Sequence, residues 1–244
     1  MEPFTNHEMT SMSRRRLLRQ MAVATTLFAT PGAFADALSE TPRLTEGPFY
    51  PNKLPLDTDN DLIILNESTS PALGEITYVS GQVLTSAGSP IRNAFVEIWQ
   101  CDNLGVYLHT QDSARKKPDT NFQGYGRFLT DADGRYSFRT IKPVPYPGRT
   151  PHIHFAVSRN GHRILTTQLL IKGHEQNERD GVFRAIKDPK ARELLLVDFK
   201  PIPDSKIGEL TAKFDLVLGT TPPEPEGEIK GGIGQPEFRR GQRG

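Results

Sequence analysis

The chain has 244 residues, of which 36% are hydrophobic, and its 30 Lys and Arg residues nearly balance 29 Asp and Glu residues. This length allows one sizeable core, and the near-neutral charge excludes the basic surface that is typical of nucleic-acid-binding proteins. A single cysteine, Cys101, rules out an internal disulfide, and the 20 prolines and 21 glycines indicate many turns, which favours a β-rich fold.

Residues 1–35 have the three parts of an export signal. The pair Arg14-Arg15 precedes an apolar stretch, and Ala33-Phe34-Ala35 fits the small-x-small rule of signal peptidase. The alternatives are an amphipathic N-terminal helix and a membrane anchor, but residues 21–35 are too few and too weakly apolar to span a bilayer. The sequence therefore predicts a twin-arginine signal peptide and a periplasmic or secreted protein, with no membrane association after cleavage.

The next part of the chain has no clear periodicity until the first predicted strand. Residues 36–75 are predicted to form a proline-rich segment that wraps over the surface of the domain. Residues 75–85 and 94–102 then alternate apolar and polar positions, with the turn sequence SAGSPIRN between them. This alternation has the period of two that is typical of half-buried strands.

Two hairpins are predicted farther along the chain. The first covers residues 126–141 and turns at Asp133-Gly134, and the second covers residues 152–171 and turns at Asn160-Gly161. Residues 178–195 are the one plausible helical piece, and residues 209–219 are predicted to form a final strand.

Short strands separated by these turns predict an all-β fold, an antiparallel β-sandwich with short helical and loop insertions, over residues 76–219. Residues 220–244 are rich in Pro, Gly and charge, and they predict a flexible C-terminal tail.

The stretch PVPYPGRTPHIHFAV, residues 143–157, carries candidate metal ligands. His152 and His154 are two residues apart at the start of a predicted strand, so both imidazoles point to the same face. Such a pair can give one metal ion two neutral nitrogen ligands. Two exposed histidines on a strand are an equally good interpretation of this pair alone.

Two tyrosines extend the candidate site. Tyr146 lies between prolines in VPYPG, and Tyr107 follows the strand that contains Trp99. A phenol has a pKa of about 10 in water, and a hard trivalent cation can deprotonate it at neutral pH. Two phenolates and two imidazoles would make a ferric site rather than a zinc site. The alternative is that each tyrosine is a half-buried aromatic residue with its hydroxyl in water.

With these residues in place, the chain resembles the intradiol ring-cleavage dioxygenases, the family of protocatechuate 3,4-dioxygenase and catechol 1,2-dioxygenase. The resemblance covers most of residues 45–173, with matching order and spacing. Its segments are TEGPFYP (45–51), VEIWQCDNLGVY (96–107), GYGRFLTDADGRYSFRTIKPVPYPGR (124–149), PHIHFAV (151–157) and TTQLLIKG (166–173).

The resemblance implies a function and a role for each matching residue. Fe(III) would be bound by the residues at the family's ligand positions, which are Tyr107, Tyr146, His152 and His154. The catechol substrate would bind the iron and displace Tyr146, and it would react with O2 to give a cis,cis-muconate-type product. Arg149 would stabilise negative charge on the ring, and Gln168 matches a further family position on the next strand. The implied partners are a small aromatic diol and O2, with no nucleic acid; a homo-oligomer stays open.

This chain differs from the family in two places. Only about forty residues separate the signal from the first strand, where catechol 1,2-dioxygenases carry a long helical region. The link from the second tyrosine to the histidines is only PGRTP, which is shorter than in protocatechuate enzymes and implies a more open site.

Two other functions compete with the dioxygenase. The first is a non-catalytic exported β-sandwich that binds a partner without a metal, because fold does not determine function. The second is zinc or copper on the two histidines, which would leave Tyr107 and Tyr146 unexplained.

Overall fold

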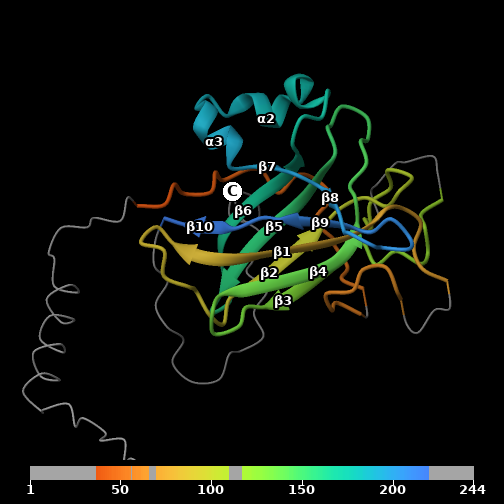
Figure 1. Cartoon of the computed structure of the whole chain (residues 1–244), viewed down its shortest axis with the longest axis horizontal. Helices are drawn as coiled ribbons and strands as arrows, with labels where there is room; N and C mark the ends of the chain where they lie inside the picture. The colour runs from red at the N-terminus through yellow and green to blue at the C-terminus, as the bar shows by residue number, and fades with distance from the viewer. Residues whose placement is uncertain (1–36, 56, 66–69, 110–116, 220–244) are drawn as a thin grey trace, which may run out of the picture. The chain divides into compact units, whose positions relative to one another are not determined.

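The computed structural model describes residues 37–55, 57–65, 70–109 and 117–219. The predicted signal peptide, residues 1–35, and the predicted tail, residues 220–244, lie outside these ranges. The described domain consists mostly of strands in two five-stranded sheets that face each other across a hydrophobic core (Figure 1). The predicted all-β sandwich is therefore confirmed, although both sheets are mixed and not purely antiparallel.

The first sheet is organised around one long central strand, β1 (Ile76–Thr85). Every second residue of β1 is buried, so that one of its faces packs on the core. It pairs antiparallel with one neighbour and parallel with two others. The other strands of this sheet are β4 (Arg135–Ile141), β8 (Lys200–Pro201), β9 (Leu210–Lys213) and β10 (Leu216–Leu218).

The second sheet has the order β3-β2-β5-β6-β7 and carries the predicted histidine pair. All eight residues of β5 are buried, so both faces of this strand are covered by other parts of the chain. A histidine on β5 is therefore held in the interior. The strands are β2 (Phe95–Trp99), β3 (Tyr125–Leu129), β5 (His152–Arg159), β6 (His162–Ile171) and β7 (Leu196–Val197).

One predicted hairpin is confirmed and the other is wrong. Strands β5 and β6 pair antiparallel, and Asn160 and Gly161 between them both have positive φ, as a type I′ turn requires. Strands β3 and β4, predicted as a hairpin over 126–141, lie in different sheets, and the turn at Gly134 carries the chain from one sheet to the other. Alternation shows that a strand has one buried face, but it does not show which strand lies beside it.

The predicted helix over residues 178–195 is three short pieces instead of one. They are the 3₁₀ turn η1 (Asn177–Arg179), α2 (Gly181–Ala185) and α3 (Pro189–Glu193). The chain leaves the helical conformation at Asp180 and Asp188, whose side chains cap α2 and α3 by accepting backbone N–H bonds. The short helices lie beside β7 in Figure 1.

The C-terminal part also contains pairings that the pattern did not predict. The predicted strand 209–219 divides into β9 and β10, both parallel to β1, and β7 pairs parallel with β6. No helix among the described residues combines the length and the hydropathy of a membrane-spanning segment.

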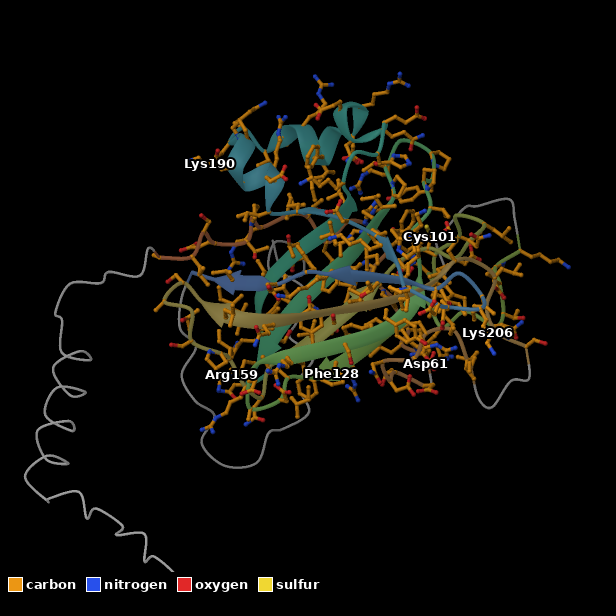
Figure 2. All side chains as sticks on the ribbon, viewed as in Figure 1. Asp61, Cys101, Phe128, Arg159, Lys190 and Lys206 are labelled. Carbon is orange, nitrogen blue, oxygen red and sulfur yellow. The ribbon has the colours of Figure 1, made fainter. Side chains whose placement is uncertain are left out.

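A second, aromatic cluster of buried residues lies apart from the main core. Figure 2 shows Cys101 of this cluster at the opposite end of the sandwich from Arg159, where β5 ends. The aromatic cluster therefore surrounds the start of β5, where the two histidines lie. The cluster contains Trp99, Cys101, Tyr107, Tyr125 and Ala156, with Phe49, Tyr50, Leu54, Val144 and Tyr146 packed against it.

Candidate metal centre

Strand β5 brings the two predicted histidines together in the interior. His152 and His154 are 1% and 2% exposed, and their Nε2 atoms lie 3.1 Å apart. The Nδ1 atom of His152 lies 2.6 Å from the carbonyl oxygen of Thr150. A carbonyl can only accept, so Nδ1 carries the proton and Nε2 of His152 presents its lone pair toward His154.

The ring of His154 is fixed by residues on the neighbouring strands. Trp99 of β2 pairs with His154 and stacks on it, with ring centroids 4.7 Å apart and an interplanar angle of 7°. Gln168 of β6 pairs with His154 from the other side. Among the described residues, Nδ1 of His154 has no hydrogen-bond partner although it is buried. Stacking on Trp99 and the contact of its Nε2 atom with His152 therefore orient this ring.

Tyr107 reaches the histidines from a tight loop after β2. The carboxylate of Asp102 organises this loop, because its Oδ1 atom accepts the backbone N–H groups of Leu104 and Val106. The Tyr107 hydroxyl lies 3.3 Å from Nε2 of His152, and its ring is buried and stacked on Phe49. Tyr107, a predicted ligand, therefore lies in contact with His152, another predicted ligand.

Tyr146 approaches the same cluster from a turn that leads into β5. The backbone N–H of Arg149 donates to the carbonyl of Tyr146 at 3.0 Å, which closes the turn. Pro147 suits its second position, and Gly148, with φ 82°, suits its third. The Tyr146 ring lies 5.4 Å from that of Tyr107. Tyr146 is half-buried, so it is the member of the four that solvent can reach.

Burial determines the protonation of these four side chains. Burial, followed by the charge of Arg149, lowers the pKa of His152 to about 4, and burial also lowers that of His154, so both imidazoles are neutral at pH 7. Burial raises the pKa of Tyr107 and of Tyr146. Both phenols therefore stay protonated until a cation binds, and a cation would favour their ionised form.

The donor set fits a metal ion. Two imidazole nitrogens bound to one ion at about 2.1 Å lie about 3.0–3.4 Å apart, and the Nε2 atoms of His152 and His154 are 3.1 Å apart. In the described part of the chain, no group of three or more His, Cys, Asp and Glu residues could hold a metal. Such groups supply the usual ligands of zinc. Two imidazoles with two phenols instead suit a hard trivalent ion.

Arg149 and Gln168, the two predicted catalytic residues outside the ligand set, are in direct contact. A guanidinium N–H of Arg149 donates to Oε1 of Gln168 at 2.6 Å, and the Nε–H donates to Asp180 at 2.8 Å. The Gln168 amide in turn donates to the carbonyl of Thr45 at 3.0 Å. The guanidinium is thus held in one direction, beside the turn that carries Tyr146.

Asp180 is a residue of the site that sequence reasoning missed. Its side chain is fully buried and accepts from Arg149, from the backbone of Thr150 and from two amides at the start of α2. Burial would raise the pKa of Asp180, but the amides of Phe183 and Thr150 and the charge of Arg149 outweigh this and lower it. The cap could be found in the sequence, where an Asp precedes an apolar run, but its contact with Arg149 could not.

A buried ionic network contacts Trp99 through the ring of Tyr50. Sequence reasoning also missed this network. Glu97 is fully buried, and one of its oxygens accepts the hydroxyls of Tyr50 and Tyr125, both at 2.7 Å. The other oxygen binds Arg163, which also pairs with Glu46. This network attaches the segment that precedes Tyr50 to strands β2, β3 and β6. The same segment places Phe49 on Tyr107.

Comparisons with known proteins show which family this chain is similar to. A family model described as a dioxygenase matches residues 45–220. The protocatechuate 3,4-dioxygenase beta chain of Burkholderia cepacia is 38% identical over 169 residues, which cover 66% of this chain and 71% of the relative. Catechol 1,2-dioxygenase 2 of Acinetobacter lwoffii is 34% identical over 178 residues, which cover 63% of this chain. The match spans 62% of that relative, which is less than two thirds of the relative's length.

Solved structures are also similar to this chain, and one of them is similar in both fold and sequence. It is the dioxygenase domain of a dioxygenase carbohydrate-binding protein fusion from Streptomyces sp. SirexAA-E. The superposition has a TM-score of 0.55 with 31% identity, and it covers 75% of this chain and all of that domain.

Proposed function

Because this chain belongs to the intradiol ring-cleavage dioxygenase family, we propose that it cleaves a catechol-type ring with O2 at a non-haem Fe(III) centre. The ligands would be Tyr107, Tyr146, His152 and His154. The product would be a cis,cis-muconate-type dicarboxylic acid that contains both atoms of O2, so the reaction needs no external reductant.

The observation that carries this proposal is the convergence of unlike donors on one point. Two neutral imidazole nitrogens and a buried phenol lie within 3.3 Å of a neighbour in the set, and a second phenol approaches from the solvent side. When bound there, ferric iron would withdraw electron density from a coordinated diol, which makes the ring reactive toward O2.

Side chains around the proposed iron site would take a proton from the substrate, stabilise its negative charge and exclude water. An incoming diol must lose its protons, and the half-exposed phenol oxygen of Tyr146 can take one as the diol replaces it. Arg149 is the last residue of the turn that carries Tyr146, and its guanidinium would stabilise negative charge that develops on the ring. Phe49 and Trp99 cover Tyr107 and His154 and keep water from them.

The proposed place of action is the periplasm or the outside of the cell. This rests on Arg14-Arg15 and on Ala33-Phe34-Ala35, which predict cleavage before Asp36. N-terminal sequencing of the exported protein should read Asp36 first; a protein that retains Met1 would contradict export by cleavage.

The cleavage itself is tested on the purified protein. We expect near-stoichiometric iron, a red-brown colour from tyrosinate-to-iron charge transfer, a spectral change when catechol is added without oxygen, and oxygen uptake equal to the catechol consumed. A colourless protein without iron that binds no catechol would support the non-catalytic binding module. Stoichiometric zinc without visible absorption would support the other metal class.

A further inference from the structure

The segment of residues 45–50 (the 45–50 segment) lies against the proposed iron site, although it supplies none of the proposed ligands. A Cβ atom placed on Gly47 would lie 3.5 Å from Cε1 of His154, so the backbone of the segment packs against this ring. Two residues later, the ring of Phe49 stacks on that of Tyr107, with centroids 4.9 Å apart. The 45–50 segment therefore contacts two of the four proposed ligands.

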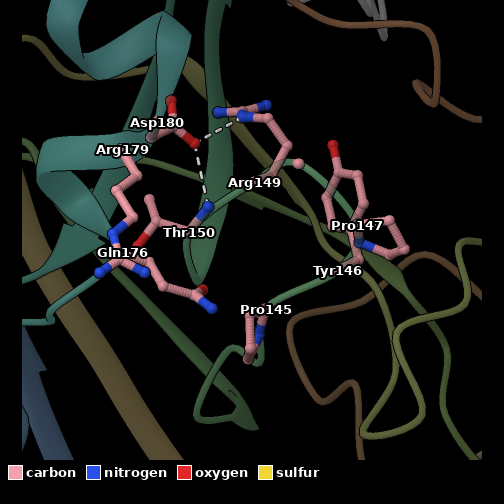
Figure 3. A pocket seen from close by; sticks show the side chains of 9 residues that line it. Pro145, Tyr146, Pro147, Arg149, Thr150, Gln176, Arg179 and Asp180 are labelled. Atoms are coloured by element: carbon pink, nitrogen blue, oxygen red, sulfur yellow. Dashed lines mark hydrogen bonds and ion pairs between the residues drawn. The ribbon is translucent and has the colours of Figure 1, made fainter.

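The 45–50 segment also reaches the residue that would stabilise charge on the substrate ring. The carbonyl of Thr45 accepts from the amide of Gln168, and Oε1 of Gln168 accepts from the guanidinium of Arg149. Asp180 accepts from the Nε–H of the same guanidinium, as Figure 3 shows. Through Gln168, the orientation of Arg149 therefore depends on where the backbone of Thr45 lies.

Glu46 and Tyr50 fasten the 45–50 segment to the second sheet. The carboxylate of Glu46 pairs with Arg163 of β6 at 3.2 Å, and the hydroxyl of Tyr50 donates to Glu97 of β2 at 2.7 Å. Arg163 also pairs with Glu97 at 3.1 Å, and its guanidinium lies 5.2 Å from the ring centroid of Tyr50. Both attachments therefore end on one buried ion pair.

The ion pair of Glu97 and Arg163 crosses the strand that carries the histidines. Strands β2 and β6 lie on either side of β5, and neighbouring strands are about 4.8 Å apart, so the pair spans about 10 Å. Ala156 of β5 lies opposite Glu97, and Ser158 lies opposite Arg163. These two small side chains leave room for the pair. Because side chains alternate along a strand, Ala156 and His154 share the face on which the pair lies.

Burial makes this network a constraint on position rather than a large source of stability. The side chains of Glu97 and Arg163 are 0% and 1% exposed, and that of Glu46 is 9% exposed. Desolvation of buried charges offsets much of their attraction, so a buried ion pair adds little net stability. A partner that moves away, however, leaves a buried charge uncompensated. The network therefore strongly favours one position of the 45–50 segment.

We propose that Glu46 and Tyr50 are positioning residues of the iron site and that they act through the 45–50 segment. Their attachment to the buried ion pair fixes the segment, and the segment fixes the two ligand rings and the Gln168 amide that it contacts. The proposal rests on the function proposed above and adds to it two residues outside the proposed ligand set. A displacement of about 1 Å in such a site can cost about 100-fold in rate.

The test removes each attachment without leaving a buried charge unpaired. Tyr50→Phe deletes the hydroxyl and keeps the ring, and Glu97 still accepts from Tyr125. Glu46→Gln removes one carboxylate, and Arg163 keeps its pair with Glu97. Circular dichroism should show that both variants keep their sheets, and if one does not fold, the other carries the test.

Exposed residues at β1 provide matched controls for the two variants. Tyr78→Phe also removes a hydroxyl that donates to a glutamate, Glu209, but Tyr78 is 38% exposed. Glu75→Gln also removes a carboxylate from an ion pair, here with Lys142, and the Glu75 side chain is 59% exposed. Both control variants should match the wild type within about twofold in each readout.

The first readout needs no turnover. Hydrogen exchange of the full-length purified protein without substrate, followed by mass spectrometry, reports how often the 45–50 segment opens. Tyr50→Phe and Glu46→Gln should each raise the exchange rate of the peptide that contains this segment about fivefold or more. Peptides from β1 should exchange at the wild-type rate, because these variants release the segment and not the whole fold.

The second readout is the division of the loss between kcat and KM for catechol, with rates normalised to bound iron. Each variant should lower kcat about tenfold and change KM less than about threefold, because the ligands stay present while their arrangement is disturbed. The double variant should be no more than about twofold slower than the slower single variant, because both attachments act on one segment.

The outcomes separate this proposal from the one on which it rests. Normal kcat in either single variant, a lower kcat without faster exchange, or a double variant that multiplies the two losses would overturn the positioning role while ring cleavage stands. A wild-type protein that cleaves no catechol would overturn the proposed function. In that case faster exchange in the two variants would still support the attachment of the 45–50 segment, and unchanged exchange would reject it.

Discussion

Replacing His154 with alanine is expected to abolish ring cleavage and to remove most of the iron. Loss of a partner outside the ligand set typically costs about 10-fold to 100-fold in metal affinity, so loss of a direct ligand should cost more than about 100-fold. The change also removes the ring on which Trp99 stacks. Metal analysis, visible absorption and oxygen uptake would measure the effect.

The controls for this variant separate a lost ligand from a lost fold. His162→Ala removes an exposed histidine from the same hairpin and should leave iron and activity unchanged. Circular dichroism should show that His154→Ala keeps its sheets. Added imidazole can enter the space that the side chain leaves, and it should restore part of the iron and colour. A folded His154→Ala protein with normal iron would contradict the ligand assignment.

Replacing Arg149 with alanine is expected to slow cleavage strongly while the iron stays bound. Removing one preorganised group that stabilises transition-state charge typically costs about 10²–10³ in rate. Arg149 is preorganised by Gln168 and Asp180, which hold its guanidinium in a fixed direction. Because the benefit belongs to the transition state, kcat should fall far more than catechol binding. Arg149→Lys should recover only part of the rate, since an ammonium group cannot replace a planar fork.

Stopped-flow absorbance measures the two parts of this prediction separately. The anaerobic complex with catechol should form normally in Arg149→Ala, and its decay after mixing with oxygen should be slow. Arg135→Ala is the matched control, because Arg135 also pairs with an aspartate but both side chains are largely exposed. Normal decay in Arg149→Ala would show that Arg149 only supports the local structure. Loss of iron from Arg149→Ala would instead show that Arg149 helps to hold the iron ligands in position.

The loss of Arg149 also has a structural consequence that the measurements must take into account. Asp180 would keep its backbone donors but lose its ionic partner Arg149, although its carboxylate is fully buried. Removing one member of a buried pair is destabilising, because it leaves the other charge uncompensated. The rates of Arg149→Ala and Arg149→Lys are therefore best compared at a temperature at which thermal unfolding curves show that both variants are still folded.

The sequence by itself determined the class of fold and the local placement of the two candidate histidines. Alternating strands and turn residues predicted the β-sandwich, and the turn at Asn160-Gly161 correctly joined β5 to β6, because both residues tolerate positive φ. The spacing of His152 and His154 placed both rings on one face, because side chains alternate along a strand. These are local properties of the chain, so local patterns could predict them.

Only the tertiary structure decided which distant segments meet. Strands β3 and β4 lie in different sheets, because a strand with one buried face can pack on any complementary partner. The parallel pairing of β9 and β10 with β1 leaves no local signal in the sequence. The contact of Asp180 with Arg149 joins residues 31 positions apart. The pairing of Glu97 with Arg163 joins residues 66 positions apart. Such contacts form because a buried charge must find a partner, and the residue that satisfies it depends on how the whole chain packs.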